Sequence, residues 1–412
     1  MANLSRMSRD AKLLLGASGI LATSFVGIQA LLKPIYVLRL GYGPSYLGTF
    51  TSAGAFTFMV MGLISGNIGK RIGTRLCLIL GGAGTTLGMV ILPLAEFVPA
   101  QTRAILPIVS EIVLATGWSL LNVNLVPALA AVTPRQLRDS AYGLNNALMG
   151  VGTLIGNLFG GMLPGFFADR FHQILETPVP YRWALWTASG LAVAGLFPLT
   201  LIENEDTRAV TKAQQVGGSF PLRPVVFLAI YVCLRHAGWA TGQIFCRPYM
   251  DTDLALSTFS IGLITGVGQA LAVLASLLMP RLAARYSNGW ILVTSPLFLA
   301  LGLLPVGLSP RWTTAAVAQG FTLTMTAVWL PAFQSFQMKL VDDQWRSLAY
   351  GAAALGMGLG FGSVSLLGGR LVEAKGYPTV FLLGALLSLI SGAIMWGLIR
   401  TRWVEETSNS SE

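Results

Sequence analysis

The stretch RDSAYG at residues 138–143 returns as RSLAYG at residues 346–351. Downstream of each copy, a glycine pair follows at the same spacing, at 160–161 and again at 368–369. Self-similarity at a fixed spacing indicates that one structural unit is used twice. The surrounding sequence shows how large this unit is.

Two further matches lie upstream of the first pair and keep the same order. The stretch QALLKP at 29–34 resembles QIFCRP at 243–248, and Thr-Phe at 49–50 resembles Thr-Phe at 258–259. Because the matches run through most of both halves in order, the sequence predicts a duplicated unit of about half the chain.

The composition decides where this duplicated unit resides. Of the 412 residues, 54% are hydrophobic and 11% are charged, whereas soluble proteins carry about 25% charged residues. Apolar runs of about twenty residues match the thickness of a bilayer, and only helices satisfy their backbone in lipid without barrel-type alternation. A soluble enzyme and a nucleic-acid module are excluded. The predicted spans are 13–38, 44–68, 76–96, 104–130, 140–165, 182–202, 224–249, 256–279, 288–308, 312–338, 347–371 and 378–400.

The basic residues set the predicted topology. Most of the 27 lysines and arginines fall on the side that holds both chain ends, so the positive-inside rule makes both termini cytoplasmic in a bacterial-type inner (plasma) membrane. The net charge of +10 therefore reflects topology. We expect six-helix bundles at 1–202 and 223–412, joined by a polar cytoplasmic linker at 203–222. A complete two-bundle chain is expected to act as a monomer.

The sequence resembles the major facilitator superfamily along essentially its whole length. The stretch GNIGKRIGTR at 66–75 is similar to the family signature G-x-x-x-D-R-x-G-R-R, with Lys70 at the aspartate position. GTLIGNLFGG at 152–161 resembles the family's antiporter pattern G-x-x-x-G-P-x-x-G-G, with Asn157 at the proline position. The resemblance implies an all-α polytopic fold of twelve helices in two pseudo-symmetric bundles, which rock about a central site by alternating access.

The resemblance also implies which residues gate the pathway. The candidates lie at the end of the second helix and in the loop after it, along the fifth helix and just before it, and at the start of the eleventh helix, which is the repeat copy of the fifth. The gating candidates are Gly66, Lys70, Arg71, Gly73, Arg75, Arg138, Gly152, Gly156, Gly160 and Arg346. Static packing is the alternative interpretation for each glycine.

Helices 1, 4, 7 and 10 line the cavity in the family, and here they carry most of the polar side chains within spans. Polar groups at that depth usually face an interior or a water-filled path. The predicted substrate-binding residues are Gln29, Lys33, Trp118, Asn122, Arg235, Trp239, Gln243, Arg247, Gln319 and Thr326. For Lys33 and Arg247, snorkelling to the outer headgroups remains an open alternative.

Two residues are candidates for carrying a proton. Glu111 is the one carboxylate placed well inside a predicted span, and burial favours its neutral form unless Lys33 keeps it ionised. His236 is the second, since a free imidazole titrates near physiological pH. A structural Glu111–Lys33 ion pair is the competing interpretation. Arg235 lies too far from either interface to snorkel, which favours a role in the site.

The predicted function is secondary active transport, proton-coupled, of a small organic or amphipathic solute, with export favoured by the glycine pattern of the fifth helix. The alternative is an importer or uniporter of an organic anion, suggested by Lys33, Arg235 and Arg247. A receptor or scaffold that keeps the fold without transport also stays open. No catalytic motif, metal spacing or nucleotide-binding loop is present, so the expected partners are lipid, a solute and protons, without cofactor or nucleic acid.

Overall fold

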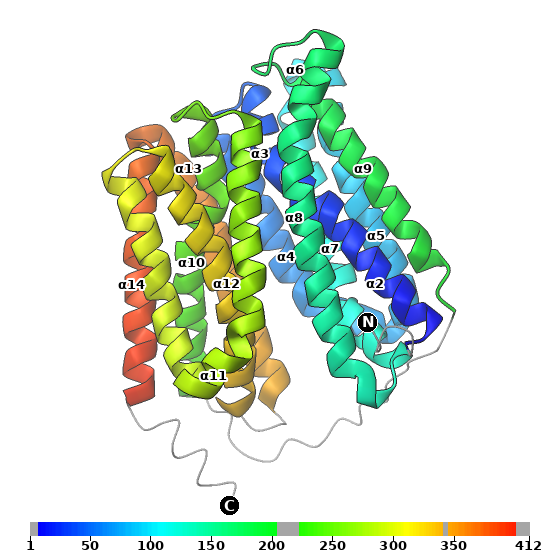
Figure 1. Cartoon of the computed structure of the whole chain (residues 1–412), viewed down its shortest axis with the longest axis vertical. Helices are drawn as coiled ribbons and strands as arrows, with labels where there is room; N and C mark the ends of the chain where they lie inside the picture. Colours follow the sequence, from blue (N-terminus) through cyan, green and yellow to red (C-terminus); the bar gives the residue numbers. More distant parts are fainter. Residues whose placement is uncertain (1–6, 204–221, 341–344, 401–412) are drawn as a thin grey trace, which may run out of the picture. The chain divides into compact units, whose positions relative to one another are not determined.

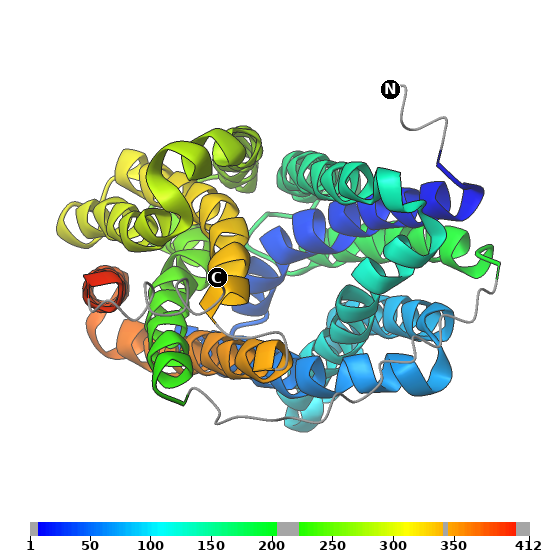
Figure 2. The same ribbon diagram turned by 90° about the horizontal axis from the view of Figure 1, so that it is seen from below.

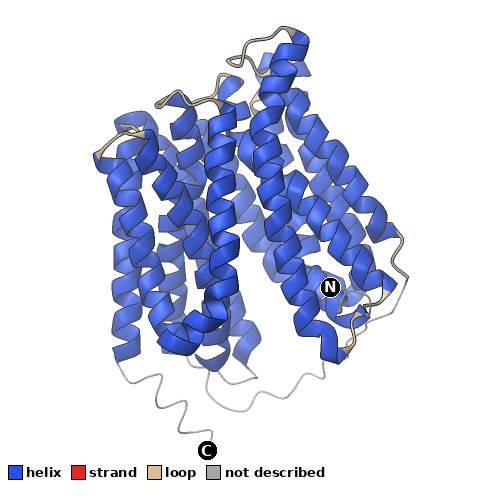
Figure 3. Cartoon of the chain, viewed as in Figure 1, coloured by secondary structure: helices blue, strands red, loops and turns tan. Residues whose placement is uncertain are grey.

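The computed structural model describes residues 7–203, 222–340 and 345–400. Within these residues the regular structure is entirely helical (Figure 3). Twelve helices are long and apolar enough to cross a membrane. Each of the twelve overlaps one predicted span, so the predicted twelve-helix membrane fold is confirmed.

Several spans are built from more than one helical segment, and Figure 1 shows the helices coloured in chain order. Their bounds are α2 Arg9–Leu21, η1 Ala22–Gln29, α3 Ala30–Arg39, α4 Pro44–Ile72, α5 Thr74–Ile91, η2 Leu92–Phe97, α6 Ala100–Arg103, α7 Ile105–Val132, η3 Arg135–Leu137, α8 Arg138–Phe171, α9 Val179–Thr200, α10 Leu222–Thr252, α11 Thr258–Leu308, α12 Trp312–Leu340, α13 Arg346–Lys375 and α14 Tyr377–Arg400.

The first span is not a regular α-helix as the sequence predicts. Its middle segment, η1, has the wider π-helical winding. At its start the Thr23 hydroxyl donates to the Gly19 carbonyl at 2.9 Å and the Ser24 hydroxyl to the Leu21 carbonyl at 3.2 Å. Such side-chain bonds compete with the backbone ladder and distort helices. The distortion ends at Gln29, one of the predicted site residues.

Two spans are merged in α11. Its helical winding is broken at Ser287, where φ is +56° and ψ is 155°. The two candidate spans within α11 are Thr258–Met279 and Arg281–Leu308, so Ser287 lies near the start of the second. They overlap the predicted spans 256–279 and 288–308.

Contacts between residues divide the described chain into two compact units. Unit 1 comprises the described residues within Met1–Gly43, Ala53–Val210 and Leu256–Ala270. Unit 2 comprises those within Pro44–Ser52, Thr211–Ala255 and Leu271–Glu412. Most of the predicted linker at 203–222 lies outside the described residues, and the predicted bundle boundaries stay a prediction.

In each unit, the helix that begins with the repeated stretch RDSAYG or RSLAYG packs against the first helix of its half of the chain. In unit 1, α8 lies along α2 and η1, and in unit 2, α13 lies along α10 (Figure 2). Gly156 of α8 faces the backbone of Thr23 and Gly27, and Gly360 of α13 faces the backbone of Cys233. In both places a Cβ would collide with the neighbouring helix, so the small residue permits the close approach. The two copies of the sequence repeat thus make the same pair of helices.

Large apolar side chains remain exposed along the outer faces of the helices. Phe166 of α8 is 62% exposed and Leu277 of α11 is 67% exposed. Apolar surface on this scale is unfavourable in water and favourable against lipid, which fits a protein that spans a membrane.

Candidate functional site

Unit 1 contains an ion pair between the first and fourth spans. Lys33 of α3 donates from Nζ to Oε1 of Glu111 on α7 at 2.6 Å. The two side chains are only 14% and 9% exposed. Lys33 therefore does not extend toward the headgroups. Two opposite charges at this depth are kept because each satisfies the other.

The carboxylate of Glu111 occupies space that a glycine leaves open. A Cβ on Gly54 of α4 would lie 2.6 Å from Cγ and 2.7 Å from Oε1 of Glu111. No side chain at position 54 fits there without displacing the carboxylate. The sequence analysis missed Gly54, because a glycine within a helix carries no chemical signal of its own.

The other predicted residues of unit 1 lie on the same helices, with different environments. Gln29 is fully buried, and neither amide atom of its side chain has a hydrogen-bond partner in the described structure. Trp118 lies against Phe25, with ring centroids 4.8 Å apart. Asn122 is half-buried. Its neighbour Asn124, which was not predicted, instead joins two helices, donating to the Ser65 carbonyl of α4 at 3.3 Å and to the Leu120 carbonyl at 2.8 Å.

A second buried ion pair in unit 1 was also missed. Arg182 of α9 donates to Oε2 of Glu96 at 2.7 Å, with side chains 15% and 13% exposed. The hydroxyl of Tyr36 donates to Oε1 of the same carboxylate at 3.0 Å. The sequence places Glu96 at the very end of a predicted span, where a solvated carboxylate is expected. The structure continues the helix to Phe97 through η2 and covers the group. Glu111 is therefore not alone as a buried carboxylate.

Unit 2 contains a buried cation without a carboxylate. Arg235 of α10 is 1% exposed. Its Cζ lies 4.2 Å from the ring centroid of Trp329 and 5.8 Å from that of Trp239. One nitrogen, Nη2, donates to Oγ1 of Thr326 on α12 at 3.1 Å. Nε and Nη1 have no hydrogen-bond partner among the described residues, and no ion pair of Arg235 is found among them either.

The other predicted site residues of α10 follow Arg235 along the helix. Nδ1 of His236 donates to the Val232 carbonyl at 3.0 Å, and its ring meets Trp239 and Trp329 edge-on, with centroids 5.7 and 5.1 Å away. Nε1 of Trp239 and Oε1 of Gln243 are unpaired in the described structure. Arg247 is 5% exposed, so it is buried and does not snorkel.

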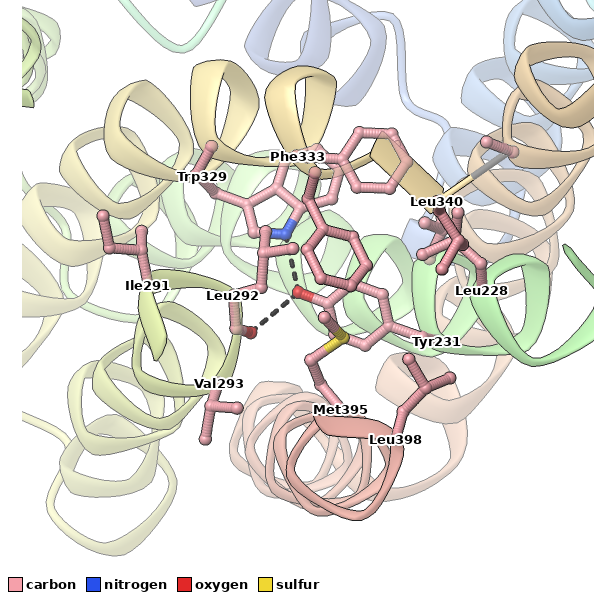
Figure 4. Close-up of a cluster of buried hydrophobic side chains, with 14 of the residues drawn as sticks. Leu228, Tyr231, Ile291, Leu292, Val293, Trp329, Phe333, Leu340, Met395 and Leu398 are labelled. Atoms are coloured by element: carbon pink, nitrogen blue, oxygen red, sulfur yellow. Dashed lines mark hydrogen bonds between the residues drawn. The ribbon is translucent and has the colours of Figure 1, made fainter. Parts of the chain in front are cut away.

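Helix α12 contributes the opposite wall. The indole of Trp329 donates to the hydroxyl of Tyr231 at 2.7 Å, and this hydroxyl donates to the Leu292 carbonyl at 2.8 Å (Figure 4). Tyr231 is fully buried and was not predicted, although it lies one helical turn before Arg235. The chain of bonds fixes the Trp329 ring that stacks on Arg235. Gln319 is fully buried, with both amide atoms unpaired in the described structure.

The signature stretch at 66–75 comprises the end of α4, Gly73 and the first residues of α5. Lys70 and Arg71 are exposed, and neither has a hydrogen-bond or ion-pair partner in the described part of the chain. Gly73 has φ of +91°, a conformation that residues with a Cβ rarely adopt. Arg75 donates to the Thr200 carbonyl at 3.0 Å. Gly66 faces Val123 at van der Waals distance.

The remaining gating candidates lie on α8 and α13. Gly152, Gly156 and Gly160 all face the first span, against Gly19, Thr23 and Ile28 respectively. Arg138, at the start of α8, is 3.4 Å from the Thr133 carbonyl. The side chain of Arg346 lies outside the described residues. The gating role of all these residues stays a prediction.

The two clusters differ in the chemistry that they allow. The ion pair of unit 1 joins a buried cation to a buried carboxylate. The guanidinium of unit 2 holds unused donors beside aromatic rings. No group of three or more His, Cys, Asp or Glu side chains among the described residues is arranged to hold a metal ion.

Comparisons with known proteins show the family of the chain. A sequence model of the Major Facilitator Superfamily matches residues 14–248 and 228–412. The multidrug efflux pump LfrA of Mycolicibacterium smegmatis is 24% identical over 303 residues, which are 63% of this chain and 59% of that protein. The chain thus matches less than two thirds of that relative's length. A D-xylose–proton symporter superposes with a TM-score of 0.75 at 16% identity, over 94% of this chain and 97% of the other. The inward-open xylose transporter XylE from E. coli gives 0.74 at 14% identity, over 98% and 99%. The chain belongs to the major facilitator superfamily.

Proposed function

We propose that the chain is a secondary active transporter that uses a proton gradient to export a small organic or amphipathic solute by alternating access. Membership of the family supports transport. One observation supports proton coupling above all others: the buried pair of Lys33 and Glu111 at 2.6 Å. The physiological setting in this proposal is a plasma membrane, with both termini cytoplasmic and the chain acting as a monomer.

The ion pair is suited to coupling because a single proton changes its charge. With Glu111 ionised, the pair is neutral. With Glu111 protonated, Lys33 keeps its charge and loses its partner, which is costly in a low-dielectric interior. The two protonation states therefore favour different surroundings for Lys33. A transporter needs two such states, each preferred by a different conformation.

The direction of transport rests on weaker analogies. The relative named above is an efflux pump, and the glycine pattern of α8 resembles that of the family's antiporters. The D-xylose–proton symporter has a similar fold, so the fold alone does not decide between symport and antiport.

A second candidate function is uptake or uniport of an organic anion. The unpaired guanidinium of Arg235 favours it, because a buried cation with free donors is complementary to an anionic group.

His236, the second proton candidate, donates to a backbone carbonyl and lies between two tryptophans. We therefore assign the proton to Glu111.

Flux in proteoliposomes with a pH dye in the lumen tests the proposal. A solute library is first screened by thermal shift, and each hit is then added outside the vesicles. Solute entry in exchange for protons alkalinises the lumen, whereas symport acidifies it. Glu111→Gln should abolish the pH change, and Glu203→Gln, whose carboxylate is 83% exposed, should not.

Three outcomes distinguish the alternatives. A pH change that persists unaltered in Glu111→Gln rejects this residue as the proton carrier. Solute flux without any pH change indicates uniport. Solute binding without flux indicates a receptor or scaffold that retains the family fold.

A further inference from the structure

The guanidinium of Arg235 has more donors than the described protein uses. A guanidinium presents five N–H donors, and among the described residues only Nη2 has an acceptor, the Thr326 hydroxyl at 3.1 Å. Nε and Nη1 are buried and unpaired in the described structure. Stacking on Trp329 at 4.2 Å offsets part of the cost of burying the charge, but it satisfies no N–H group.

One side of Arg235 is closed by the core of unit 2. Trp329 is 1% exposed and is held by Tyr231, whose hydroxyl bonds to Leu292 (Figure 4). These residues belong to a large apolar cluster that also includes Phe333 and Met395. An anion cannot enter from this side without dismantling the core.

The other side is formed by half-buried residues. Thr326, Trp239 and Gln243 are each partly exposed. Arg235, Trp239 and Gln243 are four residues apart in turn, which places them on one face of α10. The free indole N–H of Trp239 adds a donor to those of the guanidinium. Its ring contacts Phe361 of α13, with centroids 5.5 Å apart.

The groups that face Arg235 carry no compensating charge. His236 and Tyr231 come from its own helix, Thr326 and Trp329 from α12, and Leu292 meets Tyr231 from α11. None of them is a carboxylate. Asp251 in the last turn of α10 and Asp253 just after the helix lie at least sixteen residues further along, about 24 Å at 1.5 Å per residue. The local charge is therefore positive, beside the rings of Trp239 and Trp329.

We propose that Arg235, Trp239 and Thr326 form a subsite of unit 2 that binds the carboxylate or sulfonate group of a flat organic anion. The proposal rests on the transport function proposed above and names the substrate class. The anionic group accepts from Nε, Nη1 and the Trp239 indole, and the flat body stacks on the exposed part of the Trp239 ring. Because Trp239 lies beside the guanidinium, its ring must turn for the anion to reach the buried nitrogens.

Binding to the purified full-length protein in detergent tests the subsite without any transport. The probes are benzoate and benzenesulfonate, compared with benzamide and with benzylammonium, all at matched ionic strength. Thermal stability and tryptophan fluorescence are both recorded, since a ligand of the native state raises Tm and a turning Trp239 changes emission. We expect both signals with the two anions and neither with the two controls.

The variants assign the signal to Arg235. Hydrogen bonds to charged groups are worth about 1.5–3 kcal/mol, or roughly ten- to hundredfold in affinity, so Arg235→Gln should weaken benzoate binding by that factor. Arg235→Lys keeps the charge without the planar fork and should recover only part of the affinity. Arg285→Gln is the matched control, because Arg285 also stacks on a ring of unit 2, Tyr286 at 5.3 Å, yet is exposed.

Specific results overturn the proposal. Equal responses of the wild-type protein to benzoate and benzamide do so, and this comparison needs no variant to fold. Anion binding that Arg235→Gln leaves intact also does so. Failure of the subsite leaves proton coupling through Glu111 untouched, since that proposal is judged by lumen pH in Glu111→Gln.

Discussion

The two units each bury a cation from a helix of the repeat, but they treat it differently. In unit 1, Lys33 is neutralised by Glu111 at 2.6 Å. In unit 2, Arg235 stacks on Trp329 at 4.2 Å and has no carboxylate among the described residues. The two cations are not repeat partners, because the match of QALLKP with QIFCRP pairs Lys33 with Arg247. In unit 1 the charges of Lys33 and Glu111 cancel. In unit 2 no carboxylate in the described surroundings of Arg235 cancels its positive charge.

This difference bears on stability as well as on function. Removing one partner of a buried pair strands the other charge, whereas removing an unpaired charge relieves a cost. The same kind of substitution should therefore have opposite signs in the two units. The following experiments measure that contrast, beginning with the largest expected effect.

The largest effect is expected from breaking the ion pair of unit 1. Lys33→Met should lower the free energy of unfolding by about 3–5 kcal/mol, because Glu111 is left charged and buried. The double variant Lys33→Met with Glu111→Gln removes both charges and should recover most of this loss. Denaturation in detergent of the wild-type protein, Lys33→Met, Glu111→Gln and the double variant completes one double-mutant cycle. Additive losses would show that the two side chains do not interact, and would weaken the coupling proposal.

A smaller effect is expected from filling the space beside Glu111. Gly54→Ala places a methyl group where the carboxylate lies, 2.6 Å from Cγ. Overpacking of this kind costs about 1–3 kcal/mol, and displacing the carboxylate should also lengthen its contact with Lys33. The midpoint of thermal unfolding reports the cost.

The control for this substitution is a glycine of the same helix with more room. A Cβ on Gly62 would meet only the Ser119 hydroxyl, at 3.9 Å, so Gly62→Ala should be neutral or stabilising. Removing Cγ of the acid removes the clash, so Gly54→Ala should cost less in a Glu111→Ala background than in the wild-type protein. Equal stability of Gly54→Ala and Gly62→Ala would contradict the close contact.

The sequence was sufficient to predict the helices and several of the buried charged residues, among them Lys33, Glu111 and Arg235, but not the pair of Glu96 and Arg182. Apolar run length and the basic loops determine the spans, and both are local properties. The partners of each charge were not predictable in the same way. Lys33 and Glu111 are 78 residues apart, so the sequence left snorkelling and pairing equally open for Lys33.

The groups that were missed share one property: their roles arise only from contacts with other helices. Gly54 matters because of Glu111, and Tyr231 because its hydroxyl receives the Trp329 indole. Glu96 lies at the end of a predicted span, where a solvated carboxylate is expected, but it belongs to η2 and pairs with Arg182. A pattern within one helix identifies a candidate, and only the packing of helices shows which group satisfies it.

The smallest effect, with the opposite sign, is expected in unit 2. Arg235→Met replaces an unpaired buried cation by an apolar side chain of similar length beside Trp329. Replacing buried charged groups by apolar ones is often neutral or stabilising by about 1–4 kcal/mol, and the lost stacking on Trp329 takes back about 2 kcal/mol. We therefore expect Tm to rise by a few degrees at most in the absence of any anion, while the response to benzoate disappears. A marked fall in Tm would mean that Arg235 is held by groups that stabilise the fold, and the contrast with Lys33 would then fail. An unchanged or raised Tm together with a lost benzoate response would show that unit 2 keeps this charge for binding.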